Sequence, residues 1–280
     1  MIAYRAMLDV PRELVARVSR LLTGERRARG TRRNSRALTC WKQALLGLVW
    51  FRKREEMSVL AGGFGISRAT AYRYRDEIID VLAAQAPDLH DALEAVAAEG
   101  WSHVILDGKV FRSDRCAGTT TSIKGSPIDS WYSGKHHAFG GNVQALTRPD
   151  GFPIWTSPVL PGHQHDITAA RTAGVLGALY WAAAQLNLPT LADNGYEGAG
   201  QGVHTPVKQP RDGNTLAVDH LAYNALHRST RALGERGFAL LTTRWRALQR
   251  ITASPSRIGD IVAAGLVLTH CEHALRHRTC

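Results

Sequence analysis

Two apolar runs, each closed by an aspartate with a glycine close behind, most constrain the fold of this chain. The first reads His103-Val-Ile-Leu-Asp-Gly and the second reads Leu191-Ala-Asp-Asn-Gly-Tyr. Short apolar runs that end in turn-forming residues are typical of buried strands, so we predict strands over 101–107 and 189–193. The aspartates Asp107 and Asp193 would then lie at strand ends, where glycine leaves space for a metal ion or phosphate. A strand-terminal aspartate before glycine is more often only a turn residue, so neither run alone identifies a site.

The segments around these runs alternate between strand and helix patterns. We predict hairpin-like strands around 131–147 and 152–160, and another strand near 203–208. Helical patterns cover about 166–187, 221–249 and 254–277. Strands first, followed by alternating strands and helices, predict an α/β fold in which helices flank a mixed sheet.

The positive charge of the chain is concentrated near its N-terminus. The formal net charge is +11, and residues 1–75 contain 17 Lys and Arg against 5 Asp and Glu, which gives +12. The remaining residues contain 18 and 19, which gives −1. A basic N-terminal module indicates a polyanionic partner, most simply nucleic acid. The alternative is a generally basic, solvated surface.

The cysteines and the apolar stretches exclude several classes of protein. Cys40, Cys116, Cys271 and Cys280 show no CxxC spacing. This pattern argues against a zinc ribbon and a disulfide framework, and it fits a reducing cytosol. Gly, Thr or charged residues interrupt the longest apolar stretches, so we expect no membrane-spanning helix and no membrane partner.

Residues 57–77 contain a local motif for DNA binding. A short helical segment is followed by a glycine-containing turn, an N-cap at Ser67 and a second helical segment, which together predict a helix-turn-helix. Thr39 is predicted to be the N-cap of another helix, which comes before this motif and extends to about Arg52. The alternative is a helical hairpin used only for dimerisation.

The second helix of this motif is rich in hydrogen-bond donors. Its predicted contacts to phosphates and base edges come from Ser67, Arg68, Thr70, Tyr72, Arg73 and Arg75. Its predicted packing residues, with those of the helix before it, are Ala61, Ile66, Ala71 and Tyr74.

Several segments, in this order, carry a resemblance to a known family. They are Leu106-Asp-Gly, Tyr132-Ser-Gly-Lys-His-His, Asn142-Val-Gln, Pro161-Gly-His-Gln-His-Asp-Ile-Thr-Ala-Ala-Arg, Leu191-Ala-Asp-Asn-Gly-Tyr-Glu-Gly, His204-Thr-Pro-Val-Lys, and Asn224 through Glu235. Residues 101–270 resemble the catalytic domain of DDE-superfamily transposases, in the insertion-sequence and Harbinger-like endonuclease branch. Residues 38–84 resemble the helix-turn-helix that often precedes that domain.

The resemblance implies a ribonuclease-H-like fold and a metal-dependent reaction. A helix-turn-helix domain would occupy residues 1–90 and the catalytic domain residues 91–280. Asp107, Asp193 and Glu235 would form the catalytic triad and bind Mg²⁺ or Mn²⁺, because two such metals, held by carboxylates, can stabilise both the attacking and the leaving oxygen. Metal-activated water would nick the transposon end, and the freed 3′-hydroxyl would attack target DNA.

Four further positions bear on this site. Arg231, four residues before Glu235, would share its helix face and hold a DNA phosphate or orient the glutamate. Lys135 is expected to face DNA, with the adjacent histidines. The family often carries a basic residue seven positions beyond the glutamate, where this chain has Thr242, with Arg244 two residues later. Asp166 is predicted to be the N-cap of the helix that follows it, and the alternative is a role close to the metal.

The resemblance also implies partners and a location. The protein would bind the terminal inverted repeats of its element and target DNA, form a homodimer in the synaptic complex, and reside in the cytoplasm in association with the nucleoid. Two alternatives remain open from sequence: a metal-dependent endonuclease without strand transfer, and an inactive DNA-binding regulator derived from a transposase.

Overall fold

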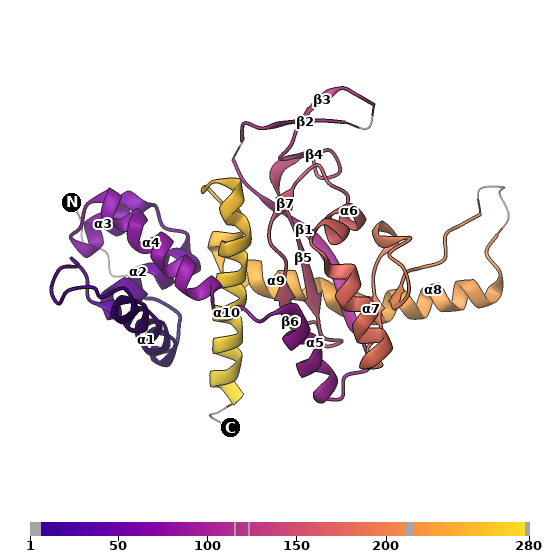
Figure 1. Ribbon diagram of the computed structural model, residues 1–280, viewed down its shortest axis with the longest axis horizontal. Helices are drawn as coiled ribbons and strands as arrows, with labels where there is room; N and C mark the ends of the chain where they lie inside the picture. The colour runs from indigo at the N-terminus through magenta and orange to yellow at the C-terminus, as the bar shows by residue number, and fades with distance from the viewer. Residues whose placement is uncertain (1–6, 115, 123, 211–214, 278–280) are drawn as a thin grey trace. The chain divides into compact units, whose positions relative to one another are not determined.

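The computed structural model describes residues 7–114, 116–122, 124–210 and 215–277. The chain forms two compact units (Figure 1). One comprises Met1–Ala86, Leu241–Gln249 and Asp260–Cys280, and the other comprises Pro87–Leu240 and Arg250–Gly259. The assignment of DNA binding to residues 1–90 and catalysis to residues 91–280 stays a prediction.

The first unit is entirely helical in its described residues. Its N-terminal part contains α1 (Arg12–Ala28), α2 (Cys40–Lys53), α3 (Met57–Phe64) and α4 (Arg68–Ala83). Leu14 and Leu22 of α1 are fully buried, as are Phe51 of α2 and Ile78 of α4. Apolar residues at helical spacing thus form one core, as amphipathic helices require.

The predicted caps of this unit are confirmed. The Thr39 side chain accepts a hydrogen bond from the Lys42 amide at 3.2 Å, and α2 begins at the next residue. The Ser67 hydroxyl accepts from the Thr70 amide, also at 3.2 Å, at the start of α4. Gly65, with a φ of 65°, ends α3 in the left-handed conformation that favours glycine. The helix-turn-helix therefore forms where the sequence predicts it.

The C-terminal segments complete the first unit. They are the end of α9 (Glu235–Arg244), the 3₁₀ turn η3 (Arg246–Leu248) and most of α10 (Ile258–His277). Pro255–Arg276 is long and apolar enough to cross a membrane by composition, but 61% of its apolar window is buried inside the protein. Trp245 donates a hydrogen bond from Nε1 to Thr269 Oγ1 at 2.9 Å. Burial of this kind is that of a core helix, so the composition is weak grounds for a membrane span.

The second unit is built on a mixed sheet whose central strand is β1 (Val104–Arg112). The antiparallel neighbour of β1 is β5 (Ala138–Thr147), which in turn pairs with β4 (Tyr132–Ser133), β6 (Pro153–Thr156) and β7 (Leu160–Pro161). On the other side, β8 (Thr190–Leu191) runs parallel to β1, and β9 (Val203–His204) runs parallel to β8. A separate hairpin joins β2 (Thr119–Thr121) to β3 (Pro127–Asp129).

Helices flank this sheet. They are α5 (Leu89–Ala98), α6 (Asp166–Thr172), α7 (Val175–Gln185) and α8 (Val218–Arg231), with the 3₁₀ turns η1 (Asn194–Tyr196), η2 (Ala232–Gly234) and η4 (Pro255–Arg257). Leu93 of α5 and Leu179 of α7 are in one core cluster with Val104 and Leu106. The side chain of Ile105, which alternates with these along β1, lies next to Gly234 of η2. The mixed sheet with flanking helices, preceded by helices, confirms the predicted α/β class.

Several predicted elements differ from the structure in extent or continuity. The strand predicted over 101–107 continues through Arg112, because β5 keeps pairing with it beyond Asp107. The helix predicted over 166–187 is divided at Gly174, which has a φ of 71°, and this left-handed residue separates α6 from α7. Aspartate and glycine therefore did not end the first strand.

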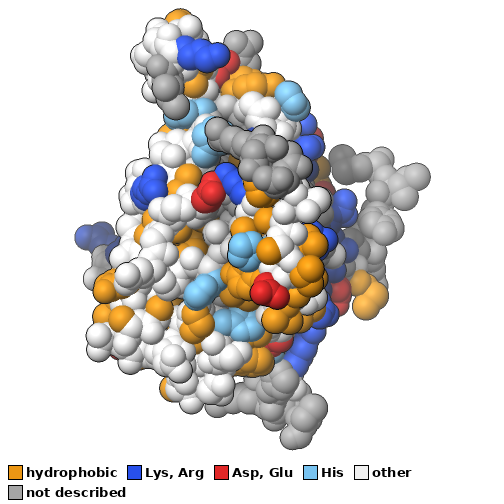
Figure 2. Space-filling view, turned by 90° about the vertical axis from the view of Figure 1, so that its right-hand side faces the viewer, with side chains coloured by type: hydrophobic (Ala, Val, Ile, Leu, Met, Phe, Trp, Pro, Cys, Tyr) orange, Lys and Arg blue, Asp and Glu red, His pale blue; other side chains and the backbone are white. Residues whose placement is uncertain are grey.

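On the α7–α8 side of the second unit, the described surface is not strongly basic. Figure 2 shows this side, where hydrophobic and uncharged side chains cover most of the described surface and Lys and Arg side chains are scattered among them. The view agrees with the net charge of −1 that the sequence gives to residues after 75.

Candidate active site

Asp107 and Asp193 meet where the parallel part of the sheet opens. β1 and β8 pair only through Val104–Thr190 and Ile105–Leu191. Asp107 lies two residues after the last pair, within β1, and Asp193 lies two residues after it, beyond the end of β8. The crevice outside the carboxyl ends of parallel strands is the usual place for a ligand in α/β sheets. The sheet therefore provides the convergence that two separate aspartates need.

Each of these carboxylates is fixed by its own backbone turn. The Gly108 amide donates a hydrogen bond to Asp107 Oδ1 at 3.0 Å, and the Gly195 amide donates to Asp193 Oδ1 at 2.8 Å. Among the described residues, the second oxygen, Oδ2, of either aspartate has no hydrogen-bond partner. Both carboxylates thus keep one oriented oxygen available to a ligand.

The electrostatics of the pair favour a cation. Burial, together with the negative charge of Asp193, raises the pKa of Asp107 from 3.8 to about 6, although the charge of Arg231 and the Gly108 amide act in the opposite direction. Two neighbouring carboxylates disfavour each other's ionised form, and a cation between them removes that penalty.

The donor set fits a hard divalent metal. Mg²⁺ and Mn²⁺ prefer carboxylate oxygens, and the Oδ2 atoms of Asp107 and Asp193 are of that kind. Within the described part of the chain, no group of three or more His, Cys, Asp and Glu side chains is arranged to hold a metal ion. The pair is therefore the core of a candidate metal site that needs further ligands.

Glu235, the third predicted acid, is placed differently from the pair. It is exposed at the first position of α9, and no contact of its side chain with Asp107 or Asp193 is found among the described residues. Its neighbour Gly234 does pack on Ile105, two residues before Asp107 on β1. The glutamate therefore belongs to the segment that covers this face of the sheet, and its role as a ligand stays a prediction.

Arg231 is close enough to Asp107 to lower the pKa of that carboxyl. It also lines a cavity of about 320 Å³ with Asp193, His227 and Arg228. The expected continuous helix from Arg231 to Glu235 is interrupted, because α8 ends at Arg231 and the 3₁₀ turn η2 follows. Arg231 thus contributes positive charge beside the aspartate pair.

Asp166 is a third acid near the pair, and the predicted N-cap role is wrong. His165 is the N-cap of α6, Asp166 is the first helical residue, and no side chain caps this helix. The Asp166 carboxylate instead accepts a hydrogen bond from Asn142 Nδ2 at 3.1 Å and forms an ion pair with Lys135 Nζ at 3.1 Å. Asp166 belongs to the segment from Pro161 to Arg171, which is one of the segments that carry the family resemblance. Its place in that segment is the sequence signal that Asp166 lies near the site.

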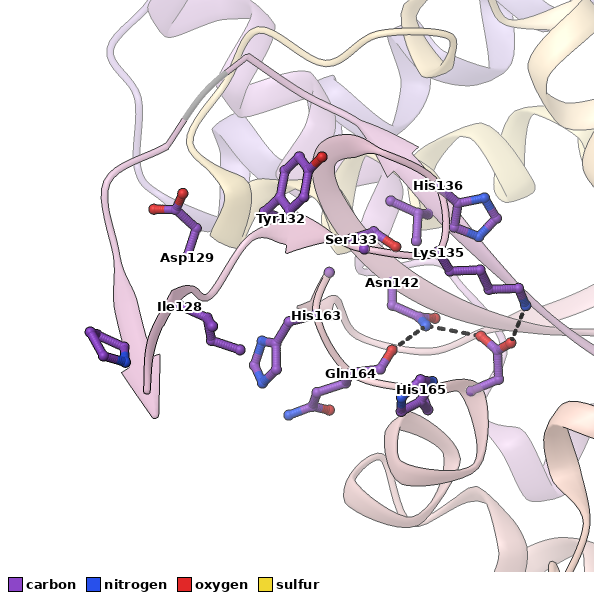
Figure 3. Close-up of a pocket in the computed structure, with 15 residues that line it drawn as sticks. Ile128, Asp129, Tyr132, Ser133, Lys135, His136, Asn142, His163, Gln164 and His165 are labelled. Atoms are coloured by element: carbon purple, nitrogen blue, oxygen red, sulfur yellow. Dashed lines mark hydrogen bonds and ion pairs between the residues drawn. The ribbon is translucent and has the colours of Figure 1, made fainter. Parts of the chain in front are cut away.

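Lys135 lies at the edge of a larger cavity, of about 600 Å³ (Figure 3). Tyr132, Ser133 and His136 line it from the β4–β5 hairpin, and His163 lines it from the segment before α6. Burial alone would lower the pKa of Lys135, but the charges of Asp166, Asp193 and Asp107 outweigh it and raise that pKa. The lysine is therefore positively charged and close to all three aspartates.

The predicted DNA-contacting helix has one exposed face. Ser67, Arg68 and Arg73 are exposed, and Thr70 and Tyr72 are partly exposed. Arg75 differs from them: it is 8% exposed, its Nη2 bonds Asp76 Oδ1 at 2.7 Å, and its guanidinium lies over the Trp50 and Tyr72 rings. The structure thus gives Arg75 a packing role and leaves five residues on the open face.

The packing residues predicted for the motif mostly lie inside the first unit. Ala61, Ala71 and Tyr74 are buried, whereas Ile66 is only partly buried. The alternation between these residues and the exposed donors on α4 is what an amphipathic recognition helix requires.

Arg244, the basic residue nearest to the position of Thr242, has structural partners. Its Nε donates to Glu272 Oε2 at 2.7 Å, and its Nη1 donates to Asp9 Oδ2 at 2.9 Å. These contacts raise the pKa of Arg244, chiefly through the hydrogen bond to Glu272. Its guanidinium is thus engaged within the first unit.

Comparisons with known proteins agree with the motifs. A family model described as DDE superfamily endonuclease matches residues 106–270, and one described as helix-turn-helix of DDE superfamily endonuclease matches residues 36–88. No curated protein matches the chain. A structure entitled "Crystal structure of a pre-cleavage Mos1 transpososome" aligns with 83% of this chain and 78% of that chain, at 11% identity and a TM-score of 0.20, which is too low to support an argument about this protein.

Proposed function

Because this chain belongs to the DDE superfamily endonucleases and carries their helix-turn-helix, we propose that it is the transposase of an insertion sequence. It binds the terminal inverted repeats of its element, cleaves a DNA strand and joins the freed end to target DNA. The observation that carries the proposal is the Asp107–Asp193 pair, in which each carboxylate is anchored through one oxygen and offers the other.

Asp107, Asp193 and Glu235 would hold Mg²⁺ or Mn²⁺. When bound, these metals supply charge stabilisation to the attacking and leaving oxygens of the phosphodiester. Asp107 and Asp193 orient their free oxygens through their backbone turns, and the positive charge of Arg231 limits the repulsion between them. Arg231 and Lys135 would bind DNA phosphates beside the aspartates.

The exposed face of α4 would bind DNA. Its five donor residues, Ser67, Arg68, Thr70, Tyr72 and Arg73, lie along the second helix of a helix-turn-helix, which is the helix that enters the major groove in such motifs. The concentration of positive charge in residues 1–75 supports this role, since phosphate contacts dominate DNA affinity.

The reaction determines the remaining partners. Joining requires two transposon ends and a target duplex in one complex, so a homodimer is proposed for the synaptic state. A protein that acts on chromosomal DNA in this way is expected in the cytoplasm, associated with the nucleoid.

A strand-transfer assay tests the proposal. The full chain is incubated with Mg²⁺ and a plasmid that carries the DNA flanking its own reading frame, and nicked and joined products are measured. Asp107→Asn and Asp193→Asn should abolish both products while leaving DNA binding intact. Asp91→Asn, which removes an exposed acid from α5, is the matched control and should be active.

The same assay separates the alternatives. Nicked products without joined products would indicate an endonuclease that lacks strand transfer. Specific binding of the flanking DNA without any cleavage would indicate a regulator derived from a transposase.

A further inference from the structure

Asp166 differs from the two aspartates beside it in how its oxygens are used. Asp107 and Asp193 each have one oxygen bonded to a backbone amide. Both oxygens of Asp166 are bonded, Oδ1 to Asn142 and Oδ2 to Lys135, and its side chain is only 13% exposed. A carboxylate with both oxygens bonded can fix the positions of its two partners, here Asn142 and Lys135.

A buried chain of side chains leads to this carboxylate. Tyr196 donates from its hydroxyl to Gln144 Oε1 at 2.6 Å, Gln144 donates from Nε2 to Asn142 Oδ1 at 2.8 Å, and Asn142 donates to Asp166. Asn142 is 1% exposed, and Gln144 and Tyr196 are 0% exposed. Every donor in this series points towards Asp166, so the series ends on an acceptor at the start of α6.

Glycine at 108 makes room for this chain beside Asp107. A Cβ at Gly108 would lie 2.6 Å from Asp166 Oδ1, 2.7 Å from Gln144 Nε2 and 2.9 Å from Tyr196 Oη. A Cβ at Gly195 would lie 3.3 Å from Asp166 Oδ2. Asp166 therefore packs against the backbone of both glycines that orient the aspartate pair.

We infer that Asp166 is a positioning residue, which holds the Lys135 ammonium beside the Asp107–Asp193 pair so that this ammonium binds a phosphate of the DNA backbone. Lys135 has a 59% exposed side chain, and a lysine this exposed would otherwise sample many rotamers. Asp166 is the described partner that fixes its head group. The inference rests on the proposed DNA-cleaving function of the same site.

The change in DNA affinity when Asp166 is removed distinguishes a positioning role from a role through charge alone. An acid near a DNA phosphate repels it, so removing an acid that only contributes charge should strengthen binding. Removing Asp166 should instead weaken binding, because Lys135 loses its anchor. A role through charge alone therefore predicts tighter DNA binding by Asp166→Asn, and a positioning role predicts weaker binding. The direction of the change in affinity separates the two roles.

The experiment measures the affinity of the full chain for a short fluorescein-labelled duplex by anisotropy over a range of salt concentrations, with EDTA present. Lys135→Met should weaken binding and reduce the slope of log affinity against log salt by about 1. Asp166→Asn should change the slope in the same direction, and the double variant should be no weaker than Lys135→Met alone.

Two variants make the test independent of a fold defect. Asp166→Glu keeps the charge but moves the carboxylate by one methylene, so it should weaken binding as well. Lys135→Arg keeps a cation, so its DNA binding should still weaken when Asp166→Asn is added, whereas the binding of Lys135→Met should not. Tighter binding by Asp166→Asn, or additive effects in the double variant, would overturn the inference.

Measuring Mn²⁺ binding in the absence of DNA by electron paramagnetic resonance separates this inference from the proposed function. If Asp166→Asn weakens Mn²⁺ binding as much as Asp107→Asn does, Asp166 is a metal ligand and the inference is wrong. If the wild type does not bind Mn²⁺, the proposed metal-dependent function fails, and the anisotropy arm still decides whether Asp166 acts through Lys135.

Discussion

The helix-turn-helix and the aspartate pair are organised on different length scales. The turn at Gly65, the N-cap at Ser67 and the exposed face of α4 all arise within residues 57–83. Asp107 and Asp193 are far apart in sequence and meet because β8 runs parallel to β1 for two residue pairs and then leaves it. The first region needs only local hydrogen bonds and one packed face, whereas the second needs the whole sheet.

This difference indicates how each region should respond to substitution. In the helix-turn-helix, Arg68 and Arg73 should contribute separately to DNA affinity, because Arg68 contacts Tyr72 and Arg73 contacts Thr70, with no contact between the two arginines among the described residues. In the sheet site, the carboxylates share one electrostatic environment, since Asp193, Asp166 and Arg231 all influence the pKa of Asp107. Changes there should be strongly coupled.

The largest expected effect concerns Glu235, the acid of the predicted triad that has no described contact with Asp107 or Asp193. Glu235→Gln should reduce the rate of plasmid nicking by about a thousandfold, as loss of a group that stabilises transition-state charge typically does. Single-turnover nicking with Mg²⁺ measures it, and Asp91→Asn serves as the control. Activity within about tenfold of the wild type would remove Glu235 from the triad and leave the aspartate pair to find its third ligand elsewhere.

The next effect concerns the exposed face of α4. Replacing both Arg68 and Arg73 with Ala should reduce the salt slope of DNA binding by about 2, which is about 1 for each phosphate contact. Anisotropy titrations measure the slope. Arg75→Met is the matched control on the same helix: it should lower the thermal stability, because Arg75 packs on Trp50 and Tyr72, and leave the slope unchanged. Equal slopes for all variants would show that α4 does not contact DNA.

The smallest effect is the dependence of stability on pH. The pKa of Asp107 is raised in the folded protein, to about 6, so the folded state binds more protons than the unfolded state between about pH 4 and pH 6. Stability from this group is therefore present at low pH and is lost as pH rises through the folded pKa. The loss amounts to at most about 3 kcal/mol for a shift of this size.

Urea unfolding in EDTA at pH 5 and pH 7.5 measures this dependence. Asp107→Asn should remove part of the difference between the two pH values, because an amide does not titrate. An unchanged difference in the variant would show that the carboxylate is not destabilised when ionised, which would contradict its burial and the nearby charge of Asp193.

The sequence by itself determined the elements whose causes are local. The caps at Thr39 and Ser67, the glycine turn between α3 and α4, and the α/β class follow from hydrogen bonding and periodicity over a few residues. The family motifs around the two aspartates fall on β1 and just after β8, although Asp107 lies within its strand and not at the predicted strand end. These features depend on neighbours in the chain, so a reader of the sequence has all of their causes in view.

Only the tertiary structure decided what depends on distant partners. It extended β1 beyond Asp107 through pairing with β5, buried Arg75, and placed Asp166 between Asn142 and Lys135 instead of at an N-cap. In each case the competing interaction comes from a residue far away in sequence: β5 for the strand, Trp50 for Arg75, and the β4–β5 hairpin for Asp166. Side-chain roles set by such long-range contacts have no local signature, and they require the folded chain.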